Sequence, residues 1–294
     1  MPNFGDAERK ILSVFKIGET VEFENLVWKI EKVGKPTCNS GEPKTDVYVL
    51  LCNDKNKKEI KISYKKENAD FLENKINCVR AEQLFGCKWK EVINASTAAI
   101  NARFKSKAKI YKKAGMRTEK GAITLGWKFE LLNKPGGDLS GRMNLTRSQV
   151  YDVYAGTNLS SDKKNAMVNN EVICNSGIAN YILVSDTVDS AESVLKQMVT
   201  IEDYITEHPH IYFACKALNY RTFKDKYDGD RPLAVQVDWK VLNGKLSSNI
   251  LYCHPLEKNG NEMYNQLLNC LKQLNIVNTD DINSNNANIE DIHQ

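Results

Sequence analysis

Three ionic side chains lie in the first quarter of the chain at a spacing that could support metal-assisted chemistry. Asp46 precedes one apolar run, and Glu59 and Lys61 flank Ile60 in a second run, with twelve residues between the two carboxylates. Mg²⁺ commonly takes one or two carboxylates from a protein, and a bound ion polarises a phosphate and lowers the pKa of a nearby water. A lysine beside it can orient that water and offset developing negative charge. These residue types therefore point to phosphodiester hydrolysis.

The two apolar runs, 47–52 and 59–64, predict the hairpin that would bring the three side chains together. With Asn53-Asp54 as a two-residue turn, the strands pair so that Asp46 lies opposite Lys61 and beside the second carboxylate. Directly opposed side chains share a sheet face about 4.5 to 5.5 Å apart. One face of the hairpin then becomes apolar, and the other gathers the ionic group. The alternative to a catalytic group is an ordinary solvated strand face that is rich in Lys and Glu.

These residues resemble a known family. Pro43-Lys-Thr-Asp46, followed by Glu59-Ile-Lys61, resembles the PD-(D/E)XK nuclease motif, in the form seen in type II restriction endonucleases. The resemblance covers about residues 35–66, and Glu42 stands where those enzymes carry Ser. It implies an α/β (α+β) fold, a restriction-endonuclease-like mixed sheet flanked by helices. It also implies that Asp46 and Glu59 bind Mg²⁺ and that Lys61 serves the attacking water.

A helix is expected over residues 6–16, and it carries Glu8. The resemblance implies that Glu8 could be a further metal ligand, whereas the alternative is that Glu8 is an ordinary surface residue. A rival acid-x-Lys triplet occurs at Asp238-Trp-Lys240, inside an alternating strand. The acids upstream of it, Asp228 and Asp230, belong to that strand or its entry. They cannot fold back opposite the triplet, which favours the first hairpin.

A basic segment is the second functional signal. Residues 88–120 hold ten basic and two acidic residues, although the whole chain has a net charge of only +4. A long helix is expected over 92–114, stopped by Gly115, with its lysines on one face. Such a stripe predicts contact with DNA phosphates, although a solvated face is the alternative. The residues nominated for this backbone contact are Arg103, Lys105, Lys109, Lys112 and Lys113.

Base reading is assigned to a glycine-rich loop and the helix after it. Arg can bind guanine bidentately, and Asn can bind adenine. The candidates are Arg142, Asn144 and Arg147, with a helix cap or a plain helix surface as the alternatives.

Further elements follow from periodicity and turn signals. A Pro-Gly-Gly loop at 135–137 follows the strand expected over 122–132, and Asn243-Gly244 marks a hairpin. The expected elements are helices over 67–75, 147–155, 189–207 and 262–274, and strands over 26–34, 122–132, 232–242 and 245–252.

Three regions are expected from these elements and from composition. They are a catalytic core with the basic helix over 1–120, a recognition half over 121–277 that is expected to continue the same domain, and an acidic, asparagine-rich tail over 278–294 that is expected to be disordered.

The bulk composition excludes several classes. There is no apolar run of 18 residues and no secretory signal, which argues against a membrane protein. The eight cysteines are scattered and the four histidines dispersed, so reduced thiols in a cytoplasm are expected and a zinc site is not.

The leading hypothesis is a Mg²⁺-dependent, type II-like site-specific endonuclease acting on double-stranded DNA. A palindromic target would favour a two-fold homodimer, and a cognate DNA methyltransferase would be its partner in the restriction system. The alternatives are a structure-specific repair or phage-defence nuclease of the same superfamily, and a non-enzymatic DNA-binding protein.

Overall fold

The computed structural model describes residues 4–294, which form two compact units. The first unit comprises the chain up to Asp70 together with 145–210, and the second comprises 71–144 and 211–294. The expected boundary at residue 120 is therefore wrong. Each unit completes its sheet with strands from a later stretch of the chain, so neither unit is continuous in sequence. The mixed α/β fold class is confirmed.

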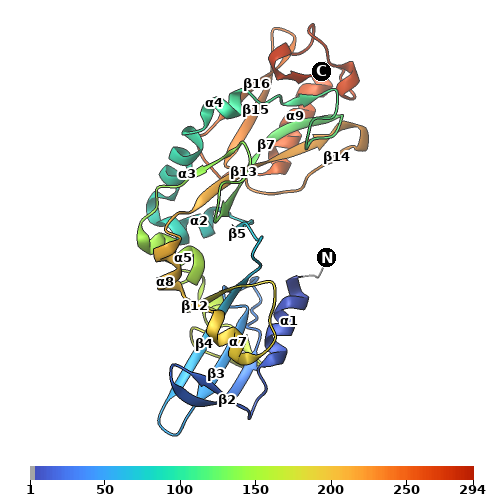
Figure 1. Ribbon diagram of the computed structural model, residues 1–294. Helices are drawn as coiled ribbons and strands as arrows, with labels where there is room; N and C mark the ends of the chain where they lie inside the picture. Colours follow the sequence, from blue (N-terminus) through green and yellow to red (C-terminus); the bar gives the residue numbers. More distant parts are fainter. Residues whose placement is uncertain (1–3) are drawn as a thin grey trace. The chain divides into compact units, whose positions relative to one another are not determined.

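The first unit contains a mixed six-stranded sheet with helices beside it (Figure 1). Its elements are α1 (Phe4–Val14), β1 (Thr20–Phe23), β2 (Leu26–Gly34), β3 (Val47–Cys52), β4 (Lys57–Lys65), α5 (Arg147–Ala155), α6 (Ser161–Lys164), β9 (Met167–Val168), β10 (Glu171–Val172), β11 (Tyr181–Val184), α7 (Ala191–Gln197), β12 (Val199–Thr200) and α8 (Ile201–Glu207).

The sheet runs in the order β1-β2-β3-β4-β11-β12, and β11 is parallel to β4 whereas the other neighbours are antiparallel. Alternation along β3 and β4 directs Val47, Val49, Ile60 and Ile62 to one face, where they are fully buried. The amphipathic helices α1 and α7 cover this face, and Ile11 from α1 joins the same apolar core. Packing of α1 therefore fixes its polar side near the start of β3.

The hairpin formed by β3 and β4 is confirmed, but its predicted register is wrong by two residues. Tyr48 lies opposite Lys61, and Leu50 lies opposite Glu59. The turn is longer than two residues because the Asn53 Oδ1 accepts the main-chain N–H groups of Lys55 (3.1 Å) and Asn56 (2.8 Å). This side-chain cap produces a four-residue loop, 53–56, which shifts the pairing without exchanging the two faces.

The second unit is built on long antiparallel strands. Its elements are β5 (Phe71–Glu73), α2 (Cys78–Phe85), η1 (Gly86–Lys88), α3 (Trp89–Ala98), α4 (Asn101–Lys105), β6 (Ile110–Tyr111), β7 (Ala122–Leu132), β8 (Ser140–Arg142), β13 (Tyr212–Arg221), η2 (Thr222–Lys224), β14 (Lys226–Tyr227), β15 (Val235–Leu242), β16 (Lys245–Leu251), α9 (Gly260–Gln273), η3 (Thr279–Asp281), η4 (Ile289–Asp291) and β17 (Ile292–His293).

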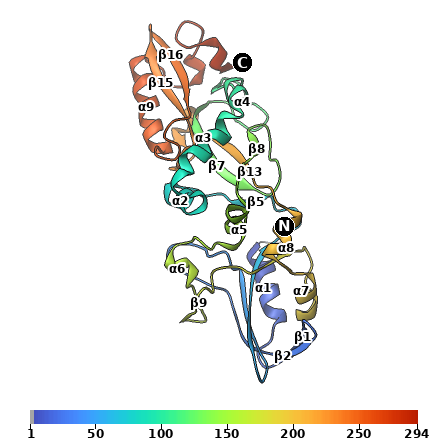
Figure 2. The same ribbon diagram turned by 90° about the vertical axis from the view of Figure 1, so that its left-hand side faces the viewer.

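The central path of this second sheet is β14-β13-β7-β15-β16, and α9 packs beside β15 (Figure 2). β7 is buried along almost its whole length, which fits its largely apolar sequence. The hairpin of β15 and β16 turns at Asn243 and Gly244, both with positive φ as its sequence predicts. The predicted helix over 262–274 is confirmed as α9, which Asn259 caps.

The prediction of one long basic helix over 92–114 is wrong. Helical structure ends at Lys105, and Ile110 is instead a buried strand residue that pairs with Ile123 of β7 and Ile292 of β17. Strand pairing at 110–111 therefore overrides the helical spacing of the lysines. The helix expected over 189–207 is likewise divided into α7 and α8 by β12, which pairs with β11. The helix expected over 67–75 is absent from the described chain, where 71–73 pair with β7.

The prediction of a disordered tail over 278–294 is also wrong. Thr279, Ile282, Ala287 and Asp291 are buried, and β17 pairs in parallel with β6. The asparagines form local caps; Asn278, for example, caps η3. Composition therefore misled the prediction, because polar side chains here satisfy the turns of an ordered segment. Over residues 4–294, no helix is both long and apolar enough to cross a membrane.

Candidate functional site

Asp46 lies directly before β3 and contacts β4. Its main-chain N–H donates to the carbonyl of Ile62 (2.8 Å), and its Oδ2 accepts the main-chain N–H of Tyr64 (2.7 Å). Both contacts tie the residue to the far end of β4. The carboxylate is thereby held in one place beside the sheet.

Charges of both signs surround this carboxylate. Burial, together with the negative charge of Glu8 on α1, raises the pKa of Asp46 to about 6. The positive charges of Lys65 and Lys35 and the bond from the Tyr64 N–H act in the opposite direction. We call Glu8, Lys35, Asp46 and Lys65 the Asp46 cluster.

The supporting contact in the Asp46 cluster is an ion pair between Lys35 Nζ and Glu8 Oε2. The Glu8 side chain is 15% exposed, whereas that of Lys35 is 41% exposed. Lys35 follows directly after β2, so three segments of the first unit contribute charged groups: α1, the end of β2 and the facing ends of β3 and β4. The Glu8 side chain is thus partly covered and ion-paired.

The other two predicted catalytic residues form a separate group. Lys61 Nζ lies 3.5 Å from Glu59 Oε2 and donates to the carbonyl of Asn175 at 3.2 Å. The hydroxyl of Tyr48 donates to Glu59 Oε1 at 2.6 Å, and burial together with this bond raises the pKa of Tyr48. Glu59 and Lys61 are thus satisfied by each other and by neighbouring groups.

The predicted contact of Asp46 with Glu59 is therefore wrong. Glu59 faces Leu50, four residues beyond Asp46, and a strand rises about 3.3 Å per residue, so the two acids are separated by about 13 Å along the strand. The shifted register is the cause. The predicted trio does not converge on one point.

Asn180 links β4 to the segment that precedes β11. Its Oδ1 accepts the main-chain N–H of Lys61 (2.8 Å), and its Nδ2 donates to the carbonyl of Glu59 (2.9 Å). Its own main-chain N–H donates to the Lys61 carbonyl. The amide side chain thus continues the ladder of the sheet at the point where β11 begins.

The donor chemistry of the Asp46 cluster fits Mg²⁺. Two carboxylates, Glu8 and Asp46, are within the number that this ion takes from a protein, and the remaining ligands are water and substrate phosphate. A cation beside Asp46 would also relieve the unfavourable effect of Glu8 on its ionisation. Within residues 4–294, no three His, Cys, Asp or Glu side chains gather closely enough to form a metal site on their own.

Two of the four predicted DNA-binding lysines are engaged by the protein itself. Lys109 is 5% exposed, and its Nζ lies 3.0 Å from Asp291 Oδ1. Lys112 Nζ donates to the carbonyls of Asp280 and Ile282. Lys105 and Lys113 remain exposed. The ordered tail therefore neutralises part of the segment that the sequence marks as basic.

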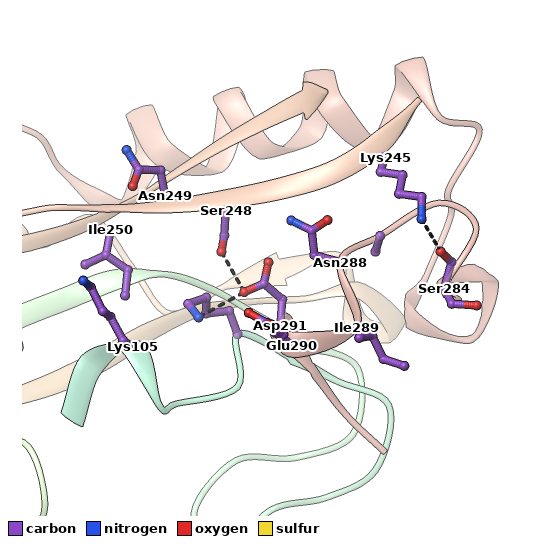
Figure 3. Close-up of a pocket in the computed structure, with 12 residues that line it drawn as sticks. Lys105, Lys245, Ser248, Asn249, Ile250, Ser284, Asn288, Ile289, Glu290 and Asp291 are labelled. Carbon is purple, nitrogen blue, oxygen red and sulfur yellow. Dashed lines mark hydrogen bonds and ion pairs between the residues drawn. The ribbon is translucent and has the colours of Figure 1, made fainter. Parts of the chain in front are cut away.

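A cavity of about 700 Å³ lies beside β16, and Figure 3 shows the residues that line it. Ser248 donates to the carboxylate of Asp291 (2.7 Å), and Lys245 donates to the carbonyl of Ser284 (2.7 Å). Lys105 lies at the same cavity. Because these groups bind the tail, they serve to fix it in place.

The remaining predicted contact residues are dispersed over both units. Arg103 Nη1 donates to the carbonyls of Asp138 (3.1 Å) and Ser140 (2.9 Å). Arg147 begins α5 and pairs with Glu202 (2.8 Å), and Thr146 is the cap of that helix. Arg142 and Asn144 are exposed. The structure does not bring this set together on one element.

Sequence reasoning missed Lys35 and Lys65 as members of the Asp46 cluster. Lys65 lies at the end of β4, which the predicted register placed too far along the strand. Lys35 follows β2, and only the pairing of β2 with β3 brings it near. A signal for Lys65 was present, since Ser63-Tyr64-Lys65 repeats the spacing of the motif without its acid.

No family model, curated protein or solved structure significantly matches this chain.

Proposed function

We propose that this protein is a Mg²⁺-dependent endonuclease that cleaves duplex DNA in the manner of type II restriction enzymes, with its catalytic centre at the Asp46 cluster. The observation that carries the proposal is the Asp46 carboxylate itself. It accepts the main-chain N–H of Tyr64, and the Asp46 main-chain N–H donates to the Ile62 carbonyl. Its pKa is raised to about 6 in the presence of a second carboxylate and two ammonium groups. Perturbed carboxylates of this kind concentrate at catalytic sites.

Each member of the cluster has a distinct role in this proposal. Asp46 and Glu8 would hold the ion, which supplies polarisation of the phosphate and a lowered pKa for the attacking water. Lys65 would stabilise negative charge that develops on the phosphate. Lys35 holds Glu8 in position through its ion pair. Lys61 and Glu59 would act at a distance, by fixing the 173–180 segment beside β4.

Single substitutions test this assignment against the one that the motif alone suggests. We expect Asp46→Asn to lower the rate of Mg²⁺-dependent cleavage of phage DNA by more than about 100-fold, because it removes a charged ligand. Lys65→Met should lower it by about 10²- to 10³-fold. Lys61→Met should lower it by less than tenfold, which makes it the matched lysine control.

Single-turnover cleavage with saturating Mg²⁺ is the measurement, and binding of the same DNA in EDTA shows that each variant remains folded. A Lys61→Met variant that is inactive beside an active Lys65→Met variant would contradict the revised site. Discrete fragments support site-specific restriction, whereas nicking or a smear supports a repair or phage-defence nuclease. Binding without any cleavage by the wild type would overturn the enzyme proposal in favour of a DNA-binding protein.

The proposal also includes the location, the oligomeric state and the partner enzyme expected of a restriction endonuclease. A cytoplasmic location, a homodimer on a palindromic site and a separate cognate methyltransferase follow from restriction chemistry. Sedimentation of the protein on a cleaved, palindromic fragment tests the dimer. A neighbouring gene for a DNA methyltransferase would support the restriction role over the repair role.

A further inference from the structure

A small basic cavity in the second unit has no part in the site described above. It has a volume of about 110 Å³ and lies where the segment before α2 meets β7 and the segment before β15. Three basic residues line it, Lys75, Lys128 and Arg231, together with the amide of Asn77. No acidic residue is among its lining residues in the described chain.

Lys128 is held in this cavity by a buried carboxylate. Glu130, 1% exposed, lies two residues further along β7 and on the same face. Its Oε1 is 2.7 Å from Lys128 Nζ, and its Oε2 is 2.9 Å from Lys216 Nζ. One carboxylate therefore fixes two ammonium groups, and this trio retains a net positive charge.

The other two basic side chains add uncompensated charge. In the part of the chain that the structure describes, no carboxylate lies within 4.0 Å of the charged atoms of Lys75 or Arg231. The nearby acids are engaged elsewhere: Glu73 binds Arg80 through both oxygens, and Asp230 accepts the main-chain N–H of Asn261. An ordinary protein surface mixes the two signs, so this concentration of positive charge is unusual.

We propose that this cavity binds a phosphate group. Its volume is below the roughly 300 to 1,000 Å³ of sites that enclose whole small molecules, so only a compact group fits inside. Arginine presents a fork of donors that matches phosphate oxygens, and lysine adds a point charge. The Asn77 amide offers a further donor, because its oxygen already caps α2 by accepting the Arg80 N–H.

Two sources could supply such a phosphate: the backbone of the DNA that the proposed nuclease binds, or a free phosphate-bearing ligand. The first source rests on the proposed function, whereas the cavity and its charge do not. Backbone contacts position a protein on duplex DNA without reading sequence, and this cavity adds positive charge to the unit in which the tail engages Lys109 and Lys112.

The test uses the full chain in EDTA, so that it is independent of cleavage. Lys75→Gln/Arg231→Gln removes two exposed cations and leaves the Glu130 trio intact. Lys226→Gln/Lys272→Gln is the control, because it makes the same change in net charge at exposed positions outside the cavity. Equal thermal unfolding of both variants establishes that the fold is retained.

Two measurements distinguish the sources. The first is the affinity for a short mixed-sequence duplex as a function of salt, where each lost phosphate contact should make the slope of log K against log salt shallower by about 0.9. The second is titration with inorganic phosphate, followed through the main-chain amide resonances of Asn74 to Asn77.

A shallower slope in the cavity variant alone, with shifts on adding phosphate, assigns the cavity to the DNA backbone. Shifts with an unchanged slope assign it to a free phosphate-bearing ligand. An unchanged slope without shifts overturns the proposal. If the salt slope of the cavity variant is shallower than that of the wild type, but the wild type never cuts DNA, the nuclease proposal is refuted and the phosphate-site proposal stands.

Discussion

Neighbouring groups shift the pKa of the Asp46 carboxylate in opposite directions. Burial and the charge of Glu8 favour its neutral form, and two lysines and the Tyr64 N–H favour its ionised form. Burial prevails, so at neutral pH the folded protein carries an ionised group at an energetic disadvantage. The position suits a ligand for a cation, because a bound ion would remove that disadvantage.

This imbalance predicts an unusual dependence of stability on pH. The folded-state pKa of Asp46, about 6, lies above its ordinary value of 3.8, so the folded state binds a proton more tightly than the unfolded state does. Stability is therefore lost as pH rises from about 4 to 6. Asp46→Asn keeps an oxygen for the Tyr64 N–H and abolishes this loss.

In metal-free protein we expect Asp46→Asn to raise the free energy of unfolding by about 3 kcal/mol near pH 8, and by much less near pH 4. Urea unfolding at both pH values measures the difference. Equal effects at the two pH values would show that Asp46 titrates as an ordinary surface acid and would weaken its assignment as a metal ligand.

Individual elements divide into those set by local sequence and those set by tertiary pairing. Local signals sufficed for β7, for α5 with its Thr146 cap and Gly156 stop, and for the hairpin at Asn243-Gly244. They failed at 92–114 and 189–207, where β6 and β12 pair with distant strands that no local pattern reveals.

The candidate site shows the same division. The hairpin and the place of Asp46 at its start could be read from alternation and from the motif. The partners of Asp46 could not, because the Asn53 cap shifts the register by two residues, which moves Lys61 away from Asp46 and brings Lys65 nearer. Side chains on one strand face are therefore predictable as a set, whereas their neighbours across the hairpin depend on the turn.

The side chain of Asn180 reinforces the join between β4 and the start of β11. Asn180→Ala leaves the main-chain N–H of Lys61 and the carbonyl of Glu59 without their side-chain partner. We expect a loss of about 1–3 kcal/mol in the free energy of unfolding. Asn56→Ala, at an exposed loop position, is the control and should change it by less than about 0.5 kcal/mol. Equal effects in chemical denaturation would disprove the bridging role.

At the scale of the whole molecule, the ordered tail contributes to stability through a buried ion pair. Lys109 and Asp291 have side chains that are 7% and 6% exposed, and Ser248 also donates to Asp291. A second pair that involves the tail, Lys120 with Asp280, is about half exposed on both sides. Comparing the two pairs therefore shows how burial changes the contribution of an ion pair to stability.

We expect Asp291→Asn to destabilise the protein by about 3–5 kcal/mol, because it leaves the Lys109 ammonium buried without a counter-charge. Asp280→Asn should cost less than about 1 kcal/mol, since an exposed pair is screened by solvent. Guanidinium or urea unfolding of both variants measures this. Similar small losses would mean that the tail detaches readily in solution.

The interleaving of the two units has a consequence for synthesis on the ribosome. β4 acquires its second neighbour only when β11 emerges, 119 residues after β4 ends. At about 5–20 residues per second this interval lasts roughly 6 to 24 seconds. During it the nascent hairpin presents an unpaired strand edge, the kind of surface that other chains can join. Translation speed through residues 66–184 is therefore a determinant of how much correctly folded protein a cell obtains.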